Sequence, residues 1–167
     1  KEKPFQGLRI AVSVHLEAKT ANLGYVLSQG GAEVRLTGSN PLSTQDDVAA
    51  GLASMGVETF GIHGADPETY KAHLLETLSF KPHLIVDDGG DLVHLLGSER
   101  PDLAEHLMGG CEETTTGILR LKAREREGIL PCPMMAVNDA KAKHYYDNKY
   151  GTGQSVWDAI MHTTNLV

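Results

Sequence analysis

Short apolar segments alternate along the chain with longer segments in which apolar residues recur at helical spacing. A short apolar run bounded by turn residues predicts a buried strand, and apolar residues three or four apart predict an amphipathic helix. The predicted strands are residues 8–14, 33–36, 57–62, 83–86 and 134–137. The predicted helices are residues 17–29, 46–55, 68–80, 91–96, 102–108, 115–127 and 154–165. This alternation predicts an α/β fold, a three-layer Rossmann-like parallel sheet with helices on both faces.

Local signals set several of the predicted helix ends. Pro67 suits the first turn of a helix, and Gly128 suits the end of one. Ser43 is followed three residues later by Asp46, a spacing that resembles a capping box and predicts a helix start there.

Composition narrows the class of protein. A length of 167 residues fits one domain, and a net charge of −7 argues against nucleic acid as a partner, because phosphate binding needs a basic face. No apolar run approaches the roughly 20 residues that span a membrane, and the start of the chain has no signal-peptide pattern. Cys111 and Cys132 have no paired spacing, which is typical of free thiols. We therefore expect a soluble, cytoplasmic protein.

Polar residues gather directly after the predicted strands. They are His15 and residues 38–45, 87–91, 112–116 and 138–147. In open parallel sheets, ligands bind beyond the carboxyl ends of the strands. These segments are therefore the candidate binding site.

Three carboxylates surround two glycines in residues 87–91. The spacing of a calcium-binding EF-hand loop is missing. Asp91 is interpreted as the N-cap of the helix that follows. Asp88, at the end of a strand, is a candidate acid or base.

Two further clusters have both a structural and a functional interpretation. Glu112 and Glu113 precede three threonines, and acids with poor helix formers suit either a helix start or a ligand contact. Lys143 and Asp147 are four residues apart, so on a helix they share one face. They form either a surface ion pair or a base that takes a proton from a sugar hydroxyl.

A partial dinucleotide-binding motif lies at residues 151–156, where two of the three glycines are present. No clear strand precedes it, so we reject it as a phosphate loop, and the chain has no NAD site of its own. The remaining histidines show no metal-ligand spacing, and no metal is predicted.

The clusters, in this order, resemble those of the S-adenosyl-L-homocysteine hydrolase family, in the form found in archaea and thermophiles. The matching stretches cover nearly the whole chain. They are residues 14–21 (VHLEAKTA), 40–47 (NPLSTQDD), 87–92 (DDGGDL), 112–117 (EETTTG), 137–139 (VND) and 143–151 (KHYYDNKYG). The resemblance implies that residues 1–167 form the substrate domain, with an NAD-binding domain expected beyond them.

The resemblance also implies a mechanism: NAD oxidises the ribose 3′-hydroxyl, homocysteine is eliminated, water adds, and the ketone is reduced again. The catalytic residues implied are His15, Asp88, Glu113, Lys143 and Asp147. Lys143 takes the 3′-hydroxyl proton, and Asp147 holds the 2′ and 3′ hydroxyls. Asp88 and His15 handle protons at C4′ and C5′, and Glu113 binds the 2′-hydroxyl.

The remaining implied contacts are with the cofactor and with the substrate. Thr114, Thr115, Thr116 and Asn148 face the nicotinamide ribose, Asn138 supports Lys143, and Thr20 belongs to the substrate-binding set. The full-length family is homo-oligomeric, and its substrate is a small nucleoside thioether.

Glu17 and Lys19 depart from the family pattern, in which many members have threonine and glutamate or glutamine. Lysine only donates hydrogen bonds and an ionised glutamate only accepts them, a pattern that complements hypoxanthine better than adenine. The full enzyme is therefore expected to accept S-inosyl-L-homocysteine, S-adenosyl-L-homocysteine or both. The alternative is a Glu17–Lys19 ion pair beside an adenine that other groups hold.

Two function classes stay open. The first is the substrate domain of this hydrolase, inactive alone because it lacks the hydride acceptor. The second is a stand-alone nucleoside-binding or regulatory module that has lost catalysis. The acid–base residues favour the first, because a binding module does not need proton-transfer groups.

Overall fold

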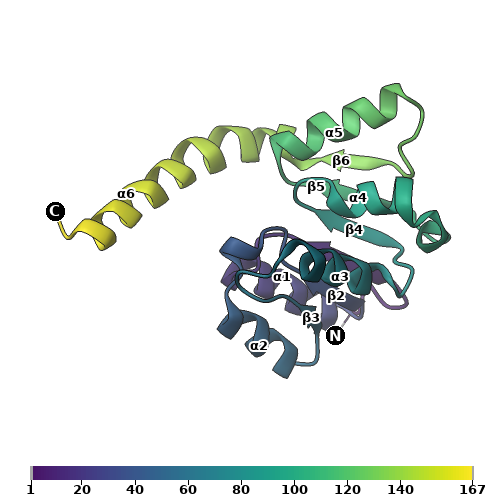
Figure 1. Ribbon diagram of the computed structural model, residues 1–167, viewed down its shortest axis with the longest axis horizontal. Helices are drawn as coiled ribbons and strands as arrows, with labels where there is room; N and C mark the ends of the chain where they lie inside the picture. The colour runs from purple at the N-terminus through teal and green to yellow at the C-terminus, as the bar shows by residue number, and fades with distance from the viewer. Residues whose placement is uncertain (1, 167) are drawn as a thin grey trace.

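The computed structural model describes residues 2–166, which form a six-stranded parallel sheet flanked by helices (Figure 1). The strand order is β3-β2-β1-β4-β5-β6. The strands are β1 (Arg9–Ser13), β2 (Glu33–Thr37), β3 (Glu58–Phe60), β4 (Leu84–Asp87), β5 (Gly109–Glu112) and β6 (Met134–Ala136). All five strand pairings are parallel, so the predicted α/β fold is confirmed.

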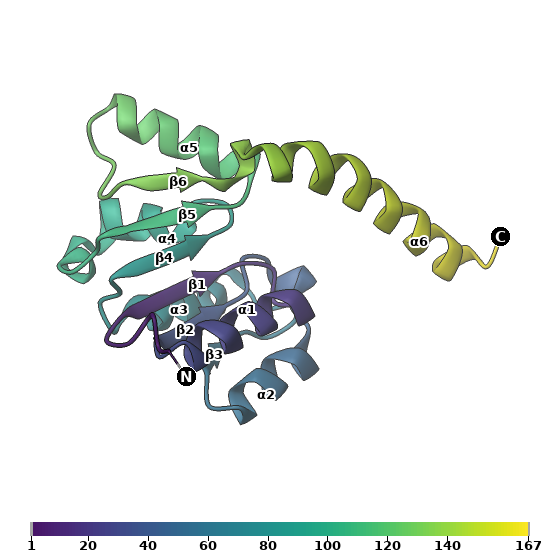
Figure 2. The same cartoon turned by 180° about the vertical axis from the view of Figure 1, so that it is seen from behind.

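The helices cover the sheet from two sides (Figures 1 and 2). They are α1 (Ala18–Gln29), α2 (Asp46–Ser54), α3 (Pro67–Leu78), α4 (Asp91–His94), α5 (Thr115–Arg126) and α6 (Thr152–Thr164). α1 and α2 lie on one face, and α3, α4 and α5 lie on the other. Parallel crossovers are right-handed, so the helices change face where the direction of strand addition reverses.

The strand order reverses between β1 and β4, which are neighbours in the sheet although 75 residues separate Arg9 from Leu84 in sequence. Ligands of open α/β sheets bind in the crevice beside such a reversal. The loops after β1 and β4 carry His15 and Asp88. The topology therefore brings these two candidate residues to the same crevice.

Strand β5 was not predicted, because its sequence begins with Gly109 and Gly110, and glycine is depleted in strands. The structure shows why glycine is present at position 110. A Cβ atom there would lie 2.4 Å from the Ile85 side chain and 2.9 Å from Met134 Sδ. Close packing against β4 and β6 therefore requires glycine at position 110, although glycine in a sequence argues against a strand.

Two predicted helix caps are wrong. The N-cap of α2 is Gln45, with no side-chain hydrogen bond, and Ser43 lies in a 3-10 turn (Pro41–Ser43). The N-cap of α4 is Gly90, which adopts a φ of 78°. Asp91 is instead the first residue of that helix, where its carboxylate binds Tyr70 and Arg120. Tertiary partners displaced the local capping interaction in that case.

Three predicted helices differ in extent. The helix expected at 102–108 is only a 3-10 turn (Pro101–Ala104). Helix α4 ends at His94 and continues as a π-helical segment (Leu95–Glu99). The last helix begins earlier than expected, because a second π-helical segment (Lys143–Gly151) runs directly into α6.

Helix α6 extends away from the sheet and, through Thr164, is exposed along its whole length (Figure 1). On the α1 side, no helix of residues 2–166 lies over β4, β5 and β6 (Figure 2). An apolar hollow of about 390 Å³ lies on the sheet, lined in part by Phe5, Val86 and Met135.

None of the described helices is both long and apolar enough to cross a membrane.

Candidate functional site

A cavity of about 420 Å³ lies where the chain leaves β1 and β4, with one wall formed by the start of α1. It is lined by Val14, His15, Glu17, Lys19, Thr20, Ser43, Gln45, Asp88 and Glu113. Six of these nine residues belong to the site predicted from sequence. The strand-end rule pointed to His15, Asp88 and Glu113, and the family resemblance added Glu17, Lys19 and Thr20.

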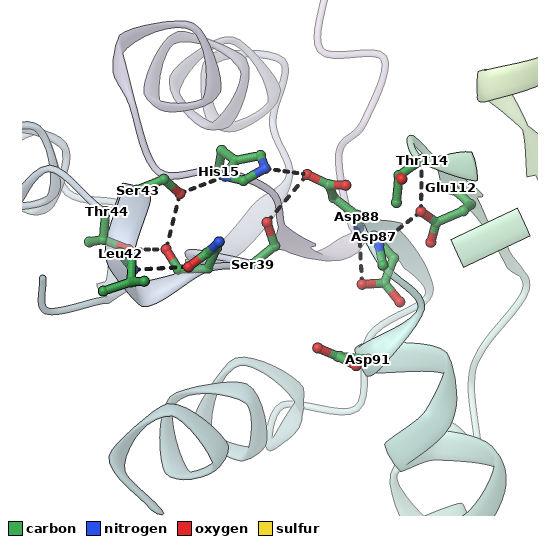
Figure 3. Close-up of polar contacts among 12 residues, drawn as sticks. His15, Ser39, Leu42, Ser43, Thr44, Asp87, Asp88, Asp91, Glu112 and Thr114 are labelled. Atoms are coloured by element: carbon green, nitrogen blue, oxygen red, sulfur yellow. Dashed lines mark hydrogen bonds and ion pairs between the residues drawn. The ribbon is translucent and has the colours of Figure 1, made fainter. Parts of the chain in front are cut away.

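His15 and Asp88 face each other across this cavity (Figure 3). His15 Nε2 lies 3.5 Å from Asp88 Oδ2. Ser43 contacts the other ring nitrogen of His15 at 2.5 Å, and Ser39 donates a hydrogen bond to Asp88 Oδ2 at 3.3 Å. The side chain of Asp88 is 9% exposed and that of His15 is 51% exposed. The pair combines a buried carboxylate with an accessible imidazole, a composition suited to proton transfer.

Two of the acids that line the cavity, Asp88 and Glu113, each follow a fully buried acid. Asp87 precedes Asp88 at the end of β4, and Glu112 precedes Glu113 at the end of β5. Asp87 and Glu112 are paired in register across the two strands. Successive strand residues point to opposite sides, so one acid of each pair is buried while the other reaches the cavity.

The two buried acids bind the backbone of the loops that carry the cavity acids (Figure 3). Asp87 accepts the N–H groups of Asp88 at 3.1 Å and Val93 at 3.2 Å. Glu112 Oε1 accepts the N–H groups of Gly89 and Thr114, both at 2.9 Å. Burial, reinforced by the charge of Glu112, raises the pKa of Asp87 to about 8. Burial also raises the pKa of Glu112.

Glu113 connects the cavity to a second cluster at the end of β6. Burial raises its pKa above the ordinary value of a glutamate. The nearby charge of Lys143 opposes this rise in pKa, whereas the charges of Asp88 and Asp147 reinforce it. Charges from both clusters therefore act on the one carboxyl group of Glu113.

The second cluster centres on Lys143, whose side chain is 13% exposed. Its Nζ atom donates a hydrogen bond to Asn138 Oδ1 at 2.8 Å and lies 3.6 Å from Asp147 Oδ2. Thr115 donates to the same Asn138 oxygen at 3.3 Å. The predicted sharing of one helical face by Lys143 and Asp147 is confirmed. Asn138 contacts Lys143 as the resemblance implied.

Glu17 and Lys19 line the cavity from the start of α1. Glu17 is the N-cap of this helix, and its Oε1 accepts the N–H of Thr20 at 3.3 Å. Lys19 is exposed, and the two side chains form no ion pair with each other. The expected alternative, a Glu17–Lys19 pair, is therefore absent from this conformation.

The residues expected to face a cofactor are mostly exposed and make few side-chain hydrogen bonds with the two clusters. Thr115 and Thr116 are exposed in the first turn of α5, and Thr114 is the N-cap of that helix. Asn148 is exposed and makes no side-chain hydrogen bond among the described contacts. Gly151 ends the π-helical segment and Gly153 lies within α6, so neither belongs to a phosphate loop. Within residues 2–166, no cluster of three metal-ligating side chains occurs.

Five residues at or beside the site lie in the candidate segments but were assigned no catalytic or binding role: Ser39, Ser43, Gln45, Asp87 and Glu112. Ser39 and Gln45 lie in a segment that was noted only for its position after a strand. The repetition of an acid pair at two strand ends was the available signal for Asp87 and Glu112. That signal required knowledge of β5, which the glycines obscured.

The chain is similar throughout to proteins of one family. A sequence family described as S-adenosyl-L-homocysteine hydrolase matches residues 1–101 and 98–164. The S-inosyl-L-homocysteine hydrolase of Methanocaldococcus jannaschii is 54% identical over 100% of this chain and 40% of its own length. The adenosylhomocysteinase of Thermococcus kodakarensis is 51% identical, with 100% and 40% covered, and that of Thermotoga maritima is 52% identical, with 100% and 41% covered.

This chain thus spans about 40% of the length of the curated relatives it matches. Among solved structures, a short-chain dehydrogenase/reductase from Serratia marcescens BCRC 10948 superposes with a TM-score of 0.46. It is 13% identical, over 78% of this chain and 73% of that one, a similarity that supports no inference about function.

Proposed function

This chain belongs to the S-adenosyl-L-homocysteine hydrolase family, and on that premise we propose that it is the substrate domain of a thioether hydrolase. The reaction is the reversible cleavage of a purine-nucleoside thioether of homocysteine into nucleoside and L-homocysteine. The whole activity resides in a longer protein that also carries an NAD-binding domain. The names of two relatives, S-inosyl-L-homocysteine hydrolase and adenosylhomocysteinase, support this substrate class.

One observation carries the proposal: six residues predicted from sequence converge on a single cavity of about 420 Å³. They combine acids, an imidazole and a lysine, and so contain proton donors and acceptors for both the sugar and the base of one nucleoside. The cluster around Lys143 adjoins this cavity through Glu113. A ribose between the two clusters has a polar partner for each of its hydroxyls.

Lys143 is assigned the proton of the ribose 3′-hydroxyl. Asn138 and Asp147 contact its ammonium group at 2.8 and 3.6 Å and hold it in place. Asp147 also faces the 2′ and 3′ hydroxyls of the substrate in this assignment, since its carboxylate is 57% exposed. Glu113, which lines the cavity, is assigned the 2′-hydroxyl.

Asp88 and His15 are assigned the protons at C4′ and C5′. The 3.5 Å separation of their side chains lets one substrate atom lie within reach of both groups. Ser39 and Ser43 orient the pair from the loop after β2. Elimination of homocysteine and addition of water then use the same two residues in opposite directions.

The family implies NAD, and the residues present fit only one part of it. The accessible hydroxyls of Thr115 and Thr116 and the amide of Asn148 suit contacts with the nicotinamide ribose, alongside Thr114. No glycine-rich loop among the described residues suits the pyrophosphate. When bound, NAD supplies the reversible oxidation of the ribose 3′-carbon, which acidifies the hydrogen at C4′. We assign most of its binding surface to the longer protein.

Glu17 and Lys19 are assigned to the edge of the base. Hypoxanthine has an acceptor at O6 and a donor at N1, so lysine and ionised glutamate complement it in that order. The absence of an ion pair between them supports this assignment, because Lys19 and the Glu17 oxygen that does not cap α1 stay available to a ligand. We therefore propose that the 6-oxo purine is the preferred base.

Calorimetric titration of this chain tests the proposal directly. Inosine or adenosine should bind with a stoichiometry near one, whereas cytidine and free ribose should bind far more weakly. Asp88→Asn and Glu113→Gln should weaken purine nucleoside binding, and Glu58→Gln, a surface change on β3, should leave it unaltered. Equal affinity for cytidine and inosine would contradict a purine nucleoside site.

The alternative, a nucleoside-binding module without catalysis, also predicts binding. A chimaera separates the two: this chain replaces the matching part of the Methanocaldococcus jannaschii relative, and hydrolysis is measured with NAD present. Turnover supports the enzyme, and binding without turnover supports the module.

A cytoplasmic location fits the thiols of Cys111 and Cys132, neither of which forms a disulfide.

A further inference from the structure

The carboxylate of Glu112 joins the two loops that carry the cavity acids. A single oxygen, Oε1, accepts the N–H of Gly89 and the N–H of Thr114, each at 2.9 Å. Gly89 directly follows Asp88, and Thr114 directly follows Glu113. The side chain of Glu112 is therefore hydrogen-bonded to the residue beside Asp88 and to the residue beside Glu113, two acids that line the cavity (Figure 3).

Glu112 has little freedom to move. The residue is fully buried, and it ends β5, in register with Asp87 of β4. Gly117 of α5 packs directly against it, because a Cβ atom at that glycine would lie 2.2 Å from the carboxyl group. The second oxygen, Oε2, is buried and has no hydrogen-bond partner. Burial of a polar oxygen without a hydrogen-bond partner costs free energy. The packing of β4, β5 and α5 around Glu112 keeps its carboxyl group in this position.

We propose that Glu112 is a positioning residue that fixes the distance between Asp88 and Glu113, and that it thereby sets the selectivity of the cavity for ribose over 2′-deoxyribose. The inference rests on the proposed function, in which these two acids contact the sugar. Glu112 does not touch the substrate. It acts through the backbone of residues 88–89 and 113–114.

Shortening the side chain of Glu112 and removing its charge should affect the hydrogen bonds to Gly89 and Thr114 differently. Glutamine keeps the length of Glu112 and an oxygen that accepts both N–H groups. Aspartate keeps the charge but is one methylene shorter, so it cannot reach both loops from the same backbone position. Glu112→Gln and Glu112→Asp therefore separate anchoring from charge. Glu58→Gln, at an exposed edge strand, serves as the matched control.

The first experiment measures by calorimetry how inosine, 2′-deoxyinosine and adenosine bind to the chain. In Glu112→Asp, the preference for inosine over 2′-deoxyinosine should fall on the order of tenfold, because one misplaced carboxylate loses a hydrogen bond to the sugar. The ratio of inosine to adenosine should stay unchanged, since the base lies at Glu17 and Lys19. Glu112→Gln and Glu58→Gln should keep both ratios.

Two results would overturn the proposal. One is a folded Glu112→Asp variant that keeps the wild-type preference for inosine over 2′-deoxyinosine. The other is a Glu112→Asp variant that loses affinity equally for both nucleosides, which indicates a general packing role. If Glu112→Asp does not fold, Glu112→Gln decides. The proposal is refuted if this variant loses its preference for inosine over 2′-deoxyinosine while the amides of Gly89 and Thr114 stay protected from hydrogen exchange.

A second experiment needs no nucleoside. Amide hydrogen exchange in Glu112→Asp should become faster at Gly89 and Thr114 together, while the amide of Val12 in β1 keeps its wild-type rate. Unchanged exchange at both amides would overturn the proposal. If the wild-type chain binds no nucleoside, the proposed function fails, and the exchange rates still decide whether Glu112 anchors the two loops.

Discussion

Lys143 and Asn138 are joined by a hydrogen bond of 2.8 Å between Nζ and Oδ1. This bond links the π-helical segment before α6 to the 3-10 turn after β6 (Val137–Asp139). Thr115 at the start of α5 donates to the same oxygen at 3.3 Å. Three elements thus meet at one amide group, which holds the proposed base near Glu113.

Replacement of Asn138 by alanine should lower turnover more than stability. The lysine loses its closest partner, and a displaced catalytic group costs up to about a hundredfold in rate. In the chimaera described above, kcat should fall by about ten- to a hundredfold with little change in KM. Lys122→Ala, which breaks only the surface pair with Asp139, should leave kcat unchanged. Equal kinetics in the two variants would remove Asn138 from the mechanism.

The double change Glu17→Thr and Lys19→Glu should reverse the base preference. Threonine still caps α1, so the helix start survives, and glutamate at position 19 can accept the adenine 6-amino group. The ratio of inosine to adenosine affinity should fall by about tenfold or more, the equivalent of one hydrogen bond. Calorimetry measures the ratio, and Lys71→Gln on α3 is the control. An unchanged ratio would show that other groups read the base.

The buried carboxyl of Asp87 should make the protein less stable as the pH rises. Burial and Glu112 raise its pKa from 3.8 to about 8. Below pH 3.8 the group is protonated in both the folded and the unfolded chain. Between the two values only the folded chain keeps the proton, so the free energy of unfolding falls by about 1.4 kcal/mol per pH unit from this group. Above the folded value the effect is constant.

Urea unfolding at several pH values between 5 and 8 checks this dependence. Asp87→Asn should reduce the slope over that range because this titrating group is gone, while Glu112, whose pKa burial also raises, still contributes. The asparagine has one acceptor oxygen where the carboxyl group offers one oxygen to Asp88 and the other to Val93, so the variant should be less stable at every pH. A variant with the wild-type slope would assign the pH dependence to other groups.

Gly117→Ala should destabilise the fold although alanine is the better helix former. The added Cβ would lie 2.2 Å from the clamped carboxyl of Glu112, so the helix or the strand end must shift. We expect a net loss of about 1–3 kcal/mol, as for other overpacked sites. Gly51→Ala in α2 is the matched control: nothing lies within 4 Å of its Cβ position, so stability should rise by about 0.5–1 kcal/mol. Urea unfolding of both variants gives the comparison.

Local sequence patterns determined the order of most strands and helices, because burial of one face imposes a period that can be counted along the chain. The same patterns showed that polar groups follow the strands, and the strand-end rule then brought His15 and Asp88 to one edge of the sheet. Neither inference depends on knowing which strands are neighbours.

Tertiary structure alone decided the rest. β5 is a strand because it pairs with β4 and β6, and Gly110 is required there because Ile85 and Met134 leave no room for a side chain, a contact that no local pattern records. Only the register of β4 and β5 pairs Asp87 with Glu112 and places their carboxyls together in the interior. Two effects raise the pKa of Asp87: burial in the interior, and repulsion by the charge of Glu112, which lies 25 positions later in the sequence. Such effects exist only once the strands have paired.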